Sequence, residues 1–220
     1  MLHEPELTGR REDERDIPVL IWRAERPLRA VSSAPLGGGI GLRRWVVNAT
    51  VPMSYDRDDP AAHLADLARG FGLDGPGVGL LTGVDVAEVI RWTDTGVQVW
   101  ATVGLGTPVP AAAPTVAASA QPVGTVNIVA YVPVRLSDAA LVNAVATATE
   151  AKAQAIAELG LPGTGTPTDA VAVLCPPDGP PDAYGGPRST WGAPLARAVH
   201  AAVLAVGRDT VVPWSDRLQG

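Results

Sequence analysis

The chain has 220 residues and a formal charge of −6, which fits one domain of ordinary size with a core of its own. Apolar residues make up 46% and charged residues 18%, so most of the chain is expected to be globular. The acidic balance argues against nucleic-acid binding, which needs clustered cations. No apolar run approaches the roughly 20 residues of a membrane span, so no membrane partner is expected.

Strands and helices are predicted in an irregular order along the chain. Runs rich in β-branched and aromatic residues predict strands, and capping residues ahead of periodic apolar positions predict helices. Strands are expected at 17–22, 28–34, 43–52, 77–83, 86–92, 96–106, 125–134 and 168–175, with a hairpin around Asp94-Thr95-Gly96. Helices are expected after Asp59-Pro60, from Ser137-Asp138 to about Leu159, and from about Gly192 to Val206. This order predicts an α+β fold, a single domain in which a mixed or largely antiparallel sheet packs with about three helices.

The two ends of the chain are interpreted as lying outside this domain. The N-terminus HEPELTGRREDERD is dominated by charge and has no apolar segment of the kind that a secretion signal needs. We therefore expect a disordered charged tail at 1–16, a folded domain at 17–210 and a C-terminal tail at 211–220. The single cysteine, Cys175, rules out an internal disulfide framework, which together with the missing signal favours a cytoplasmic protein.

One basic residue differs from all the others. Sixteen of the 17 basic residues are arginine, and the single lysine is Lys152. On a helical wheel of about 100° per residue, Lys152 lies close to Leu141, inside the apolar stripe of the long helix. A lysine there must extend its ammonium past the helix edge, pair with an acid or serve a site, and the residue count favours a site. Glu150 lies on the polar face of the same wheel, where a solvated role is expected.

Common catalytic motifs are absent from the sequence. The glycines at 37–41 form only a fragment of a dinucleotide fingerprint, and no serine lies in a GxSxG elbow. The three histidines are dispersed, so no metal site is expected. Motifs alone therefore predict a domain with polar, glycine-rich loops and no particular chemistry.

Four segments in combination are more specific. They are SSAPLGGG (32–39) with Asn48 downstream, PVGTVNIVAYVPVRLSDAALVNAVATATEAKAQAI (122–156), GTGTPTDAVAV (163–173) and YGGPRSTWGAPLARAVHAAV (184–203). In this order they resemble the adenosylcobinamide amidohydrolase family (CbiZ), and the resemblance covers about residues 28–207. The segments LLTGVDV (80–86) and TVGLGTPV (102–109) also fit the family. The string TATEAKA at 147–153, the GTVNI strand and the GTGTPTDA loop carry most of it.

The resemblance implies hydrolysis of one amide in adenosylcobinamide. The bond joins a propionate of the corrin ring to the aminopropanol linker, and its hydrolysis gives adenosylcobyric acid in cobinamide salvage. The corrinoid is then a small-molecule substrate, and no cofactor is expected. Two alternatives stay open: a corrinoid-binding protein without hydrolytic activity, and an amidase for another amide. The sequence also leaves open whether the protein forms a homo-oligomer.

Amide hydrolysis needs an activated water or nucleophile, a stabilised oxyanion and a proton for the leaving amine. The catalytic residues implied by the family strings are Glu150, Lys152, Asp169 and Asn48, with Glu150 or Asp169 as base and Lys152 at the oxyanion or the amine. The implied substrate-binding residues are Ser33, Gly37, Gly38, Gly39, Thr125, Asn127, Gly163, Thr164, Gly165 and Thr166. Backbone N–H groups of either glycine loop could form the oxyanion hole. Direct attack by water is favoured, because no base is visible beside Ser32 or Ser33.

Some of these residues also have a purely structural interpretation. Asp169 could cap the turn that begins at Thr166, and Asn127 could serve a buried hydrogen bond between strands. The sequence leaves these alternatives open.

Overall fold

A computed structural model describes residues 1–12, 14–106, 108–114 and 124–206 of the chain. In this part of the chain eight strands form one mixed sheet in the order β4-β3-β2-β8-β7-β6-β5, with β1 beside β2. The strands are β1 (Glu6–Glu12), β2 (Arg15–Ser32), β3 (Gly39–Thr50), β4 (Val78–Thr82), β5 (Ile90–Asp94), β6 (Val97–Val103), β7 (Val126–Tyr131) and β8 (Ala170–Cys175). The helices are α1 (Pro60–Gly70), α2 (Asp138–Glu158) and α3 (Gly192–Leu204), with a short 3-10 turn, η1 (Val86–Glu88). The predicted α+β fold is confirmed.

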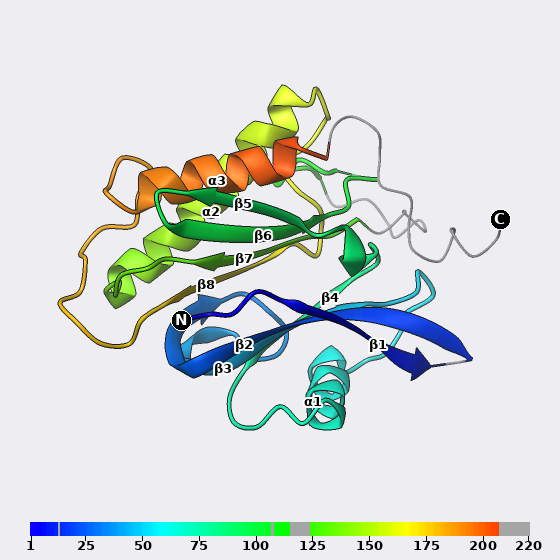
Figure 1. The fold of residues 1–220 in the computed structure, drawn as a ribbon. Helices are drawn as coiled ribbons and strands as arrows, with labels where there is room; N and C mark the ends of the chain where they lie inside the picture. The colour runs from blue at the N-terminus through cyan, green and yellow to red at the C-terminus, as the bar shows by residue number, and fades with distance from the viewer. Residues whose placement is uncertain (13, 107, 115–123, 207–220) are drawn as a thin grey trace.

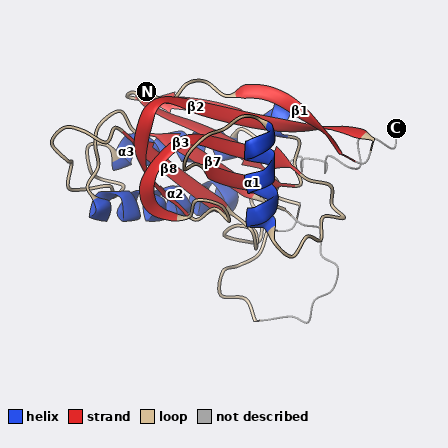
Figure 2. Ribbon diagram, turned by 90° about the horizontal axis from the view of Figure 1, so that it is seen from below, coloured by secondary structure: helices blue, strands red, loops and turns tan. Residues whose placement is uncertain are grey.

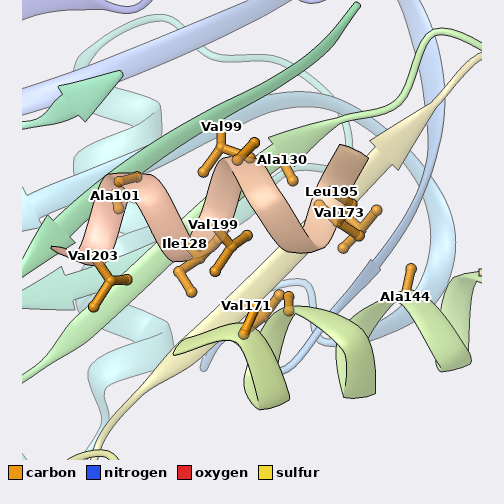
Figure 3. Close-up of a cluster of buried hydrophobic side chains, with 14 of the residues drawn as sticks. Val99, Ala101, Ile128, Ala130, Ala144, Val171, Val173, Leu195, Val199 and Val203 are labelled. Carbon is orange, nitrogen blue, oxygen red and sulfur yellow. The ribbon is translucent and has the colours of Figure 1, made fainter. Parts of the chain in front are cut away.

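The sheet is folded so that its two halves face each other, which gives four layers (Figure 1). Helices α2 and α3 cover the outer face of the β5–β8 half, where Val199 of α3 lies next to Ile128 of β7 (Figure 3). A second apolar cluster fills the space between the halves, where the rings of Trp22 and Trp100 meet edge to face. Helix α1 covers the outer face of the β2–β4 half (Figure 2). Successive side chains of a strand point to opposite faces of the sheet, so each half buries two faces. Four layers are needed to cover both faces of both halves.

Strand β2 connects the two halves. Its first part pairs with β1, its second part pairs with β8, and β3 runs beside it on the other edge. The pairing with β3 shifts register between Arg23 and Leu28, where the long strand bends. Val19 therefore packs toward α1, whereas Val31 packs in the cluster beneath α2 and α3.

Two pairs of neighbouring strands are parallel, β3 with β4 and β7 with β8, and the other pairs are antiparallel. Parallel neighbours begin and end at the same edge of a sheet. The ends of β3 and β4 therefore lie together, as do the beginnings of β7 and β8.

The predicted caps and turns are confirmed. The carboxylate of Asp59 accepts a hydrogen bond from the Ala62 N–H at 2.8 Å, and Pro60 occupies the first turn of α1. The hydroxyl of Ser137 caps α2 in the same way through Ala140. The β5–β6 hairpin turns at Thr95 and Gly96, both with positive φ, as the right-handed strand twist requires. No helix in the described ranges is long and apolar enough to cross a membrane.

The expected charged tail at 1–16 is wrong for most of its length. Residues 6–12 form β1, paired with β2 from Glu6 opposite Ile21 to Glu12 opposite Arg15. Leu2 is only 2% exposed and bridges to Ala24. The alternation of apolar and polar residues that marks a strand is hard to detect here, because β1 is an edge strand with polar residues on both faces. The expected C-terminal tail at 211–220 lies outside the described residues.

We predict that a variant lacking residues 1–12 is less stable than the full chain. It exposes the edge of β2 and removes the buried Leu2 side chain, which alone corresponds to about 3 kcal/mol on truncation. Urea unfolding followed by tryptophan fluorescence measures the change. Leu7→Ser, at an exposed position of β1, is the matched control and should leave the midpoint nearly unchanged. An unchanged midpoint in the truncated variant would contradict a structural role for β1.

Candidate active site

A cavity of about 260 Å³ lies between the two sheet halves, where β3 and β4 end and where β7 and β8 begin. Most of its lining is apolar, including Leu80, Ala170 and the loop after β3. Its non-aromatic polar side chains are Thr82, Thr125, Asn127 and Thr168. Two of these four, Thr125 and Asn127, were expected from the sequence to bind substrate.

A chain of amides crosses between the two halves beside this cavity. Asn127 of β7 donates through Nδ2 to Oδ1 of Asn48 on β3, at 3.0 Å, and to the Leu81 carbonyl at 2.9 Å. Asn48 in turn donates to the hydroxyl of Thr102 on β6, at 2.9 Å. Asn48 and Asn127 are each only 2% exposed, so these bonds form away from bulk water. The structure therefore brings the expected Asn48 and Asn127 into direct contact.

Asp169 lies immediately before β8 and collects hydrogen bonds from three segments. Its Oδ1 accepts from the Val126 N–H at 2.8 Å and from the Thr166 hydroxyl at 2.6 Å. Its Oδ2 accepts from the Thr166 N–H at 3.0 Å and pairs with Nζ of Lys152. The expected turn cap through Thr166 is thus present, and the same carboxylate also fixes the start of β7. Four donors occupy the carboxylate, which leaves it little capacity to bind a water.

Lys152 points at Asp169 and does not line the cavity. Its side chain is 8% exposed, in agreement with its predicted place on the apolar stripe of α2. A Cβ on Gly165 would clash with both Nζ of Lys152 and Oδ2 of Asp169, so the loop backbone packs directly against the ion pair. A compact ammonium fits this space, whereas a planar guanidinium is larger. The packing thus gives a physical reason for a lysine in an arginine-rich chain.

The hydroxyls of Thr125 and Thr168 meet beside Asp169. Their Oγ1 atoms are 2.6 Å apart, and the Thr168 hydroxyl also donates to the Gly124 carbonyl at 3.2 Å. Since Thr168 and Asp169 are adjacent and both contact the start of β7, the ion pair positions the polar wall of the cavity from behind.

The other expected residues have different surroundings. The Ser33 hydroxyl accepts from the Val171 N–H at 3.0 Å and extends the ladder between β2 and β8. Gly37 lines a separate depression of about 500 Å³ beside α1, and the Arg43 guanidinium donates to its carbonyl. Gly37 and Gly39 both have positive φ, as a tight turn requires, and Gly38 lies between them.

The second glycine loop packs on the segment that follows β6. The N–H of Gly163 donates to the Leu161 carbonyl, and the N–H of Thr164 donates to the Val109 carbonyl. These two N–H groups are thus committed within the protein, whereas the sequence left the N–H groups of this loop as one of two candidates for an oxyanion hole. In the described ranges no hydrogen bond or ion pair joins this loop to the Gly37–Gly39 loop.

Glu150 is exposed, as the helical wheel predicts. It lines a different depression of about 480 Å³ between α2 and α3, together with Arg197 and His200. The structure therefore does not bring Glu150 to the cavity, and its catalytic role stays a prediction from the family string.

Sequence reasoning missed several residues of the site. Thr168 and Thr102 both lie within strings that resemble the family, but a threonine in a loop or strand carries no signal of its own. Thr82 lies in the LLTGVDV segment that also fits the family, but nothing singles it out there, and Tyr55 has no signal in the sequence. Only the folding of one sheet half onto the other brings both residues to the cavity.

The loop after β3 is anchored by a buried histidine. Tyr55, which lines the cavity, stacks on His63 of α1 with ring centroids 5.5 Å apart, and its hydroxyl lies 3.1 Å from Nδ1. Burial lowers the pKa of His63, and the positive charge of Arg57 lowers it further, while Glu12 opposes them. The imidazole is therefore held neutral near pH 7.

The fold is an α+β domain with a cavity between two sheet halves. A sequence model of the adenosylcobinamide amidohydrolase family (CbiZ) matches residues 4–211. An adenosylcobinamide amidohydrolase of Methanosarcina mazei is 30% identical over 182 residues, which cover 79% of this chain and 87% of that protein. One of Halobacterium salinarum is 39% identical over 177 residues, which cover 76% of this chain and 75% of that protein. The chain therefore belongs to the adenosylcobinamide amidohydrolase family, and its resemblance to that family is confirmed.

We predict that Lys152→Ala lowers the free energy of unfolding by about 3 kcal/mol, because it leaves the Asp169 carboxylate buried without its counter-charge. Denaturant unfolding measures the change. Arg69→Ala removes an ion pair whose side chains are 76% and 66% exposed, so this control should unfold near the wild-type midpoint. Equal stability of Lys152→Ala and wild type would show that the pair does not hold the loop.

We predict that stability falls as the pH is lowered from about 7.5 to about 5, since His63 binds a proton more readily in the unfolded chain. A lowered folded pKa means that the contribution of neutral His63 is complete above its ordinary value of 6.5 and is lost as the pH falls through the folded pKa. Thermal unfolding across this range measures it. His63→Gln should flatten the dependence, whereas Tyr55→Phe, which keeps the ring stack, should retain it. If the stability of His63→Gln depended on pH as steeply as that of wild type, another group would be responsible for the pH dependence.

Proposed function

We propose that this chain hydrolyses the amide between the corrin propionate and the aminopropanol linker of adenosylcobinamide, giving adenosylcobyric acid in cobinamide salvage. The observation that carries the proposal is that three family strings meet at one cavity, two of them in its wall and the third in the ion pair behind that wall. Lys152 of TATEAKA pairs with Asp169 of the GTGTPTDA loop, which binds the start of the GTVNI strand. That strand and loop then supply Thr125, Asn127 and Thr168 to the cavity wall.

The size of the cavity limits what enters it. Pockets that enclose a whole drug-sized ligand occupy about 300–1,000 Å³, and a corrinoid is larger than such ligands. A cavity of about 260 Å³ therefore takes the side chain that carries the scissile amide, while the corrin ring stays at its mouth. The apolar lining from Met53 and Leu80 suits the methylene groups of that side chain.

We further propose direct attack by water, with Lys152 and Asp169 as positioning residues. For Asp169 to act as the base, one of its four donors must first leave, which costs a buried hydrogen bond. As a positioning residue it keeps all four and holds Thr125 and Thr168 in place. This assignment differs from the expectation that Asp169 or Lys152 contacts the reacting amide.

The corrinoid is proposed as substrate and not as a resident cofactor, since the sequence lacks the Asp-x-His-x-x-Gly pattern of proteins that hold cobalamin by a histidine. We also propose a cytoplasmic location for the protein in this role. The alternative of corrinoid binding without hydrolysis is separated from it by the assay below, and competition between substrates separates hydrolysis of another amide.

Incubation of the purified chain with adenosylcobinamide tests the proposal. We expect adenosylcobyric acid and aminopropanol as products, and we expect Asn127→Leu to lower turnover by about 100-fold or more, because it removes a polar group at the cavity wall. Arg26→Ala, which removes only an exposed ion pair, is the control for expression and handling. Binding of adenosylcobinamide without product would favour the corrinoid-binding alternative. If Glu150→Gln lost turnover while Asn127→Leu kept full activity, the active site would lie instead in the depression between α2 and α3.

A further inference from the structure

The orientation of the Asn127 amide is determined by its partners. One of its hydrogen bonds goes to the Leu81 carbonyl, which can only accept, so Nδ2 must face that carbonyl. The other goes to Oδ1 of Asn48, and these two bonds use both amide protons. Oδ1 accepts no hydrogen bond from the described residues. It is also not one of their fully buried polar atoms that lack a partner, so it is not completely enclosed. Since Asn127 lines the cavity, its Oδ1 offers an acceptor there.

The proton of the Thr125 hydroxyl is committed in a similar way. The Thr168 hydroxyl has one proton and donates it to the Gly124 carbonyl, which can only accept. In the 2.6 Å contact between the two threonines, Thr125 is therefore the donor. Its Oγ1 then has only lone pairs left for a ligand. Thr125 and Asn127 are two residues apart in extended chain, so their side chains share one face, and both line the cavity.

We propose that Thr125 and Asn127 form an acceptor pair that binds the substrate amide through its N–H and disfavours the carboxylate product. This inference rests on the proposed function and names what its site recognises. In hydrolysis the C–N bond breaks, the oxygen of water joins the acyl carbon, and the N–H leaves with the amine, which departs as an ammonium at neutral pH. The product carboxylate has no proton to donate and meets two acceptors, which costs free energy in a site shielded from water.

Thr168 is a positioning residue in this scheme. Its hydroxyl accepts the Thr125 proton and so keeps that proton out of the cavity. Removal of the Thr168 hydroxyl frees Thr125 to turn its proton toward a ligand, which would let a carboxylate bind. A residue with a merely structural role would change stability without changing the preference between amide and acid.

Equilibrium binding of two ligands tests the inference. The probes are adenosylcobyric acid and the corresponding primary carboxamide, titrated separately into the full chain at pH 7, with each ligand recovered and identified afterwards. We expect the carboxamide to bind about tenfold more tightly, the effect of one buried hydrogen bond. In Thr168→Val this preference should fall by about threefold or more through tighter binding of the acid. Thr168→Ser, which retains the hydroxyl, is the matched control and should keep the wild-type preference.

Equal binding of the two ligands by wild type would overturn the acceptor pair, and an unchanged preference in folded Thr168→Val would overturn the role of Thr168. If Thr168→Val does not fold, Thr125→Val takes its place and should weaken binding of the carboxamide alone. The proposed function has its own readout: a chain that prefers the carboxamide but never hydrolyses adenosylcobinamide would retain the acceptor pair and lose the enzymatic proposal. Hydrolysis without any preference would do the reverse.

Discussion

The ion pair of Lys152 and Asp169 is the interaction on which the cavity depends. Both side chains are nearly buried, and removal of two charges from water is costly unless every polar atom finds a partner. Here the Asp169 carboxylate receives the Lys152 ammonium, two groups of Thr166 and the Val126 N–H. The pair therefore ties helix α2, the loop before β8 and the start of β7 together at one point. Gly165 has no side chain because the loop backbone passes directly over this pair.

The cavity itself is a product of the folded sheet. Most of its polar wall belongs to the β5–β8 half, and much of its apolar lining belongs to the β2–β4 half. The amides of Asn48 and Asn127 join these halves, and the Leu81 carbonyl orients them. Because each hydrogen bond in this network determines the orientation of the next amide, the wall has a defined set of acceptors. Under the acceptor-pair proposal, such committed groups distinguish an amide from an acid, although none of the described residues that line the cavity is charged.

The resemblance to the family pointed to part of the candidate site because its strings span residues that meet in space. Thr125, Asn127, Asp169 and Lys152 all come from these strings, and the structure brings them together. The strings did not separate residues that line the cavity from residues behind it, since sequence proximity says nothing about which way a side chain points. Glu150 lies two residues from Lys152, yet on a helix that spacing places the two side chains on different faces.

The sequence by itself determined the local elements and the family. Asp59, Ser137 and the Thr95-Gly96 turn act on backbone within a few residues, so their effects can be predicted without the rest of the fold. Only the tertiary structure decided that residues 6–12 form a strand, because β1 is stabilised by its pairing with β2 and has no apolar face of its own. It also decided the partner of Lys152 and the acceptors of the cavity, since these depend on contacts between segments that the chain holds far apart.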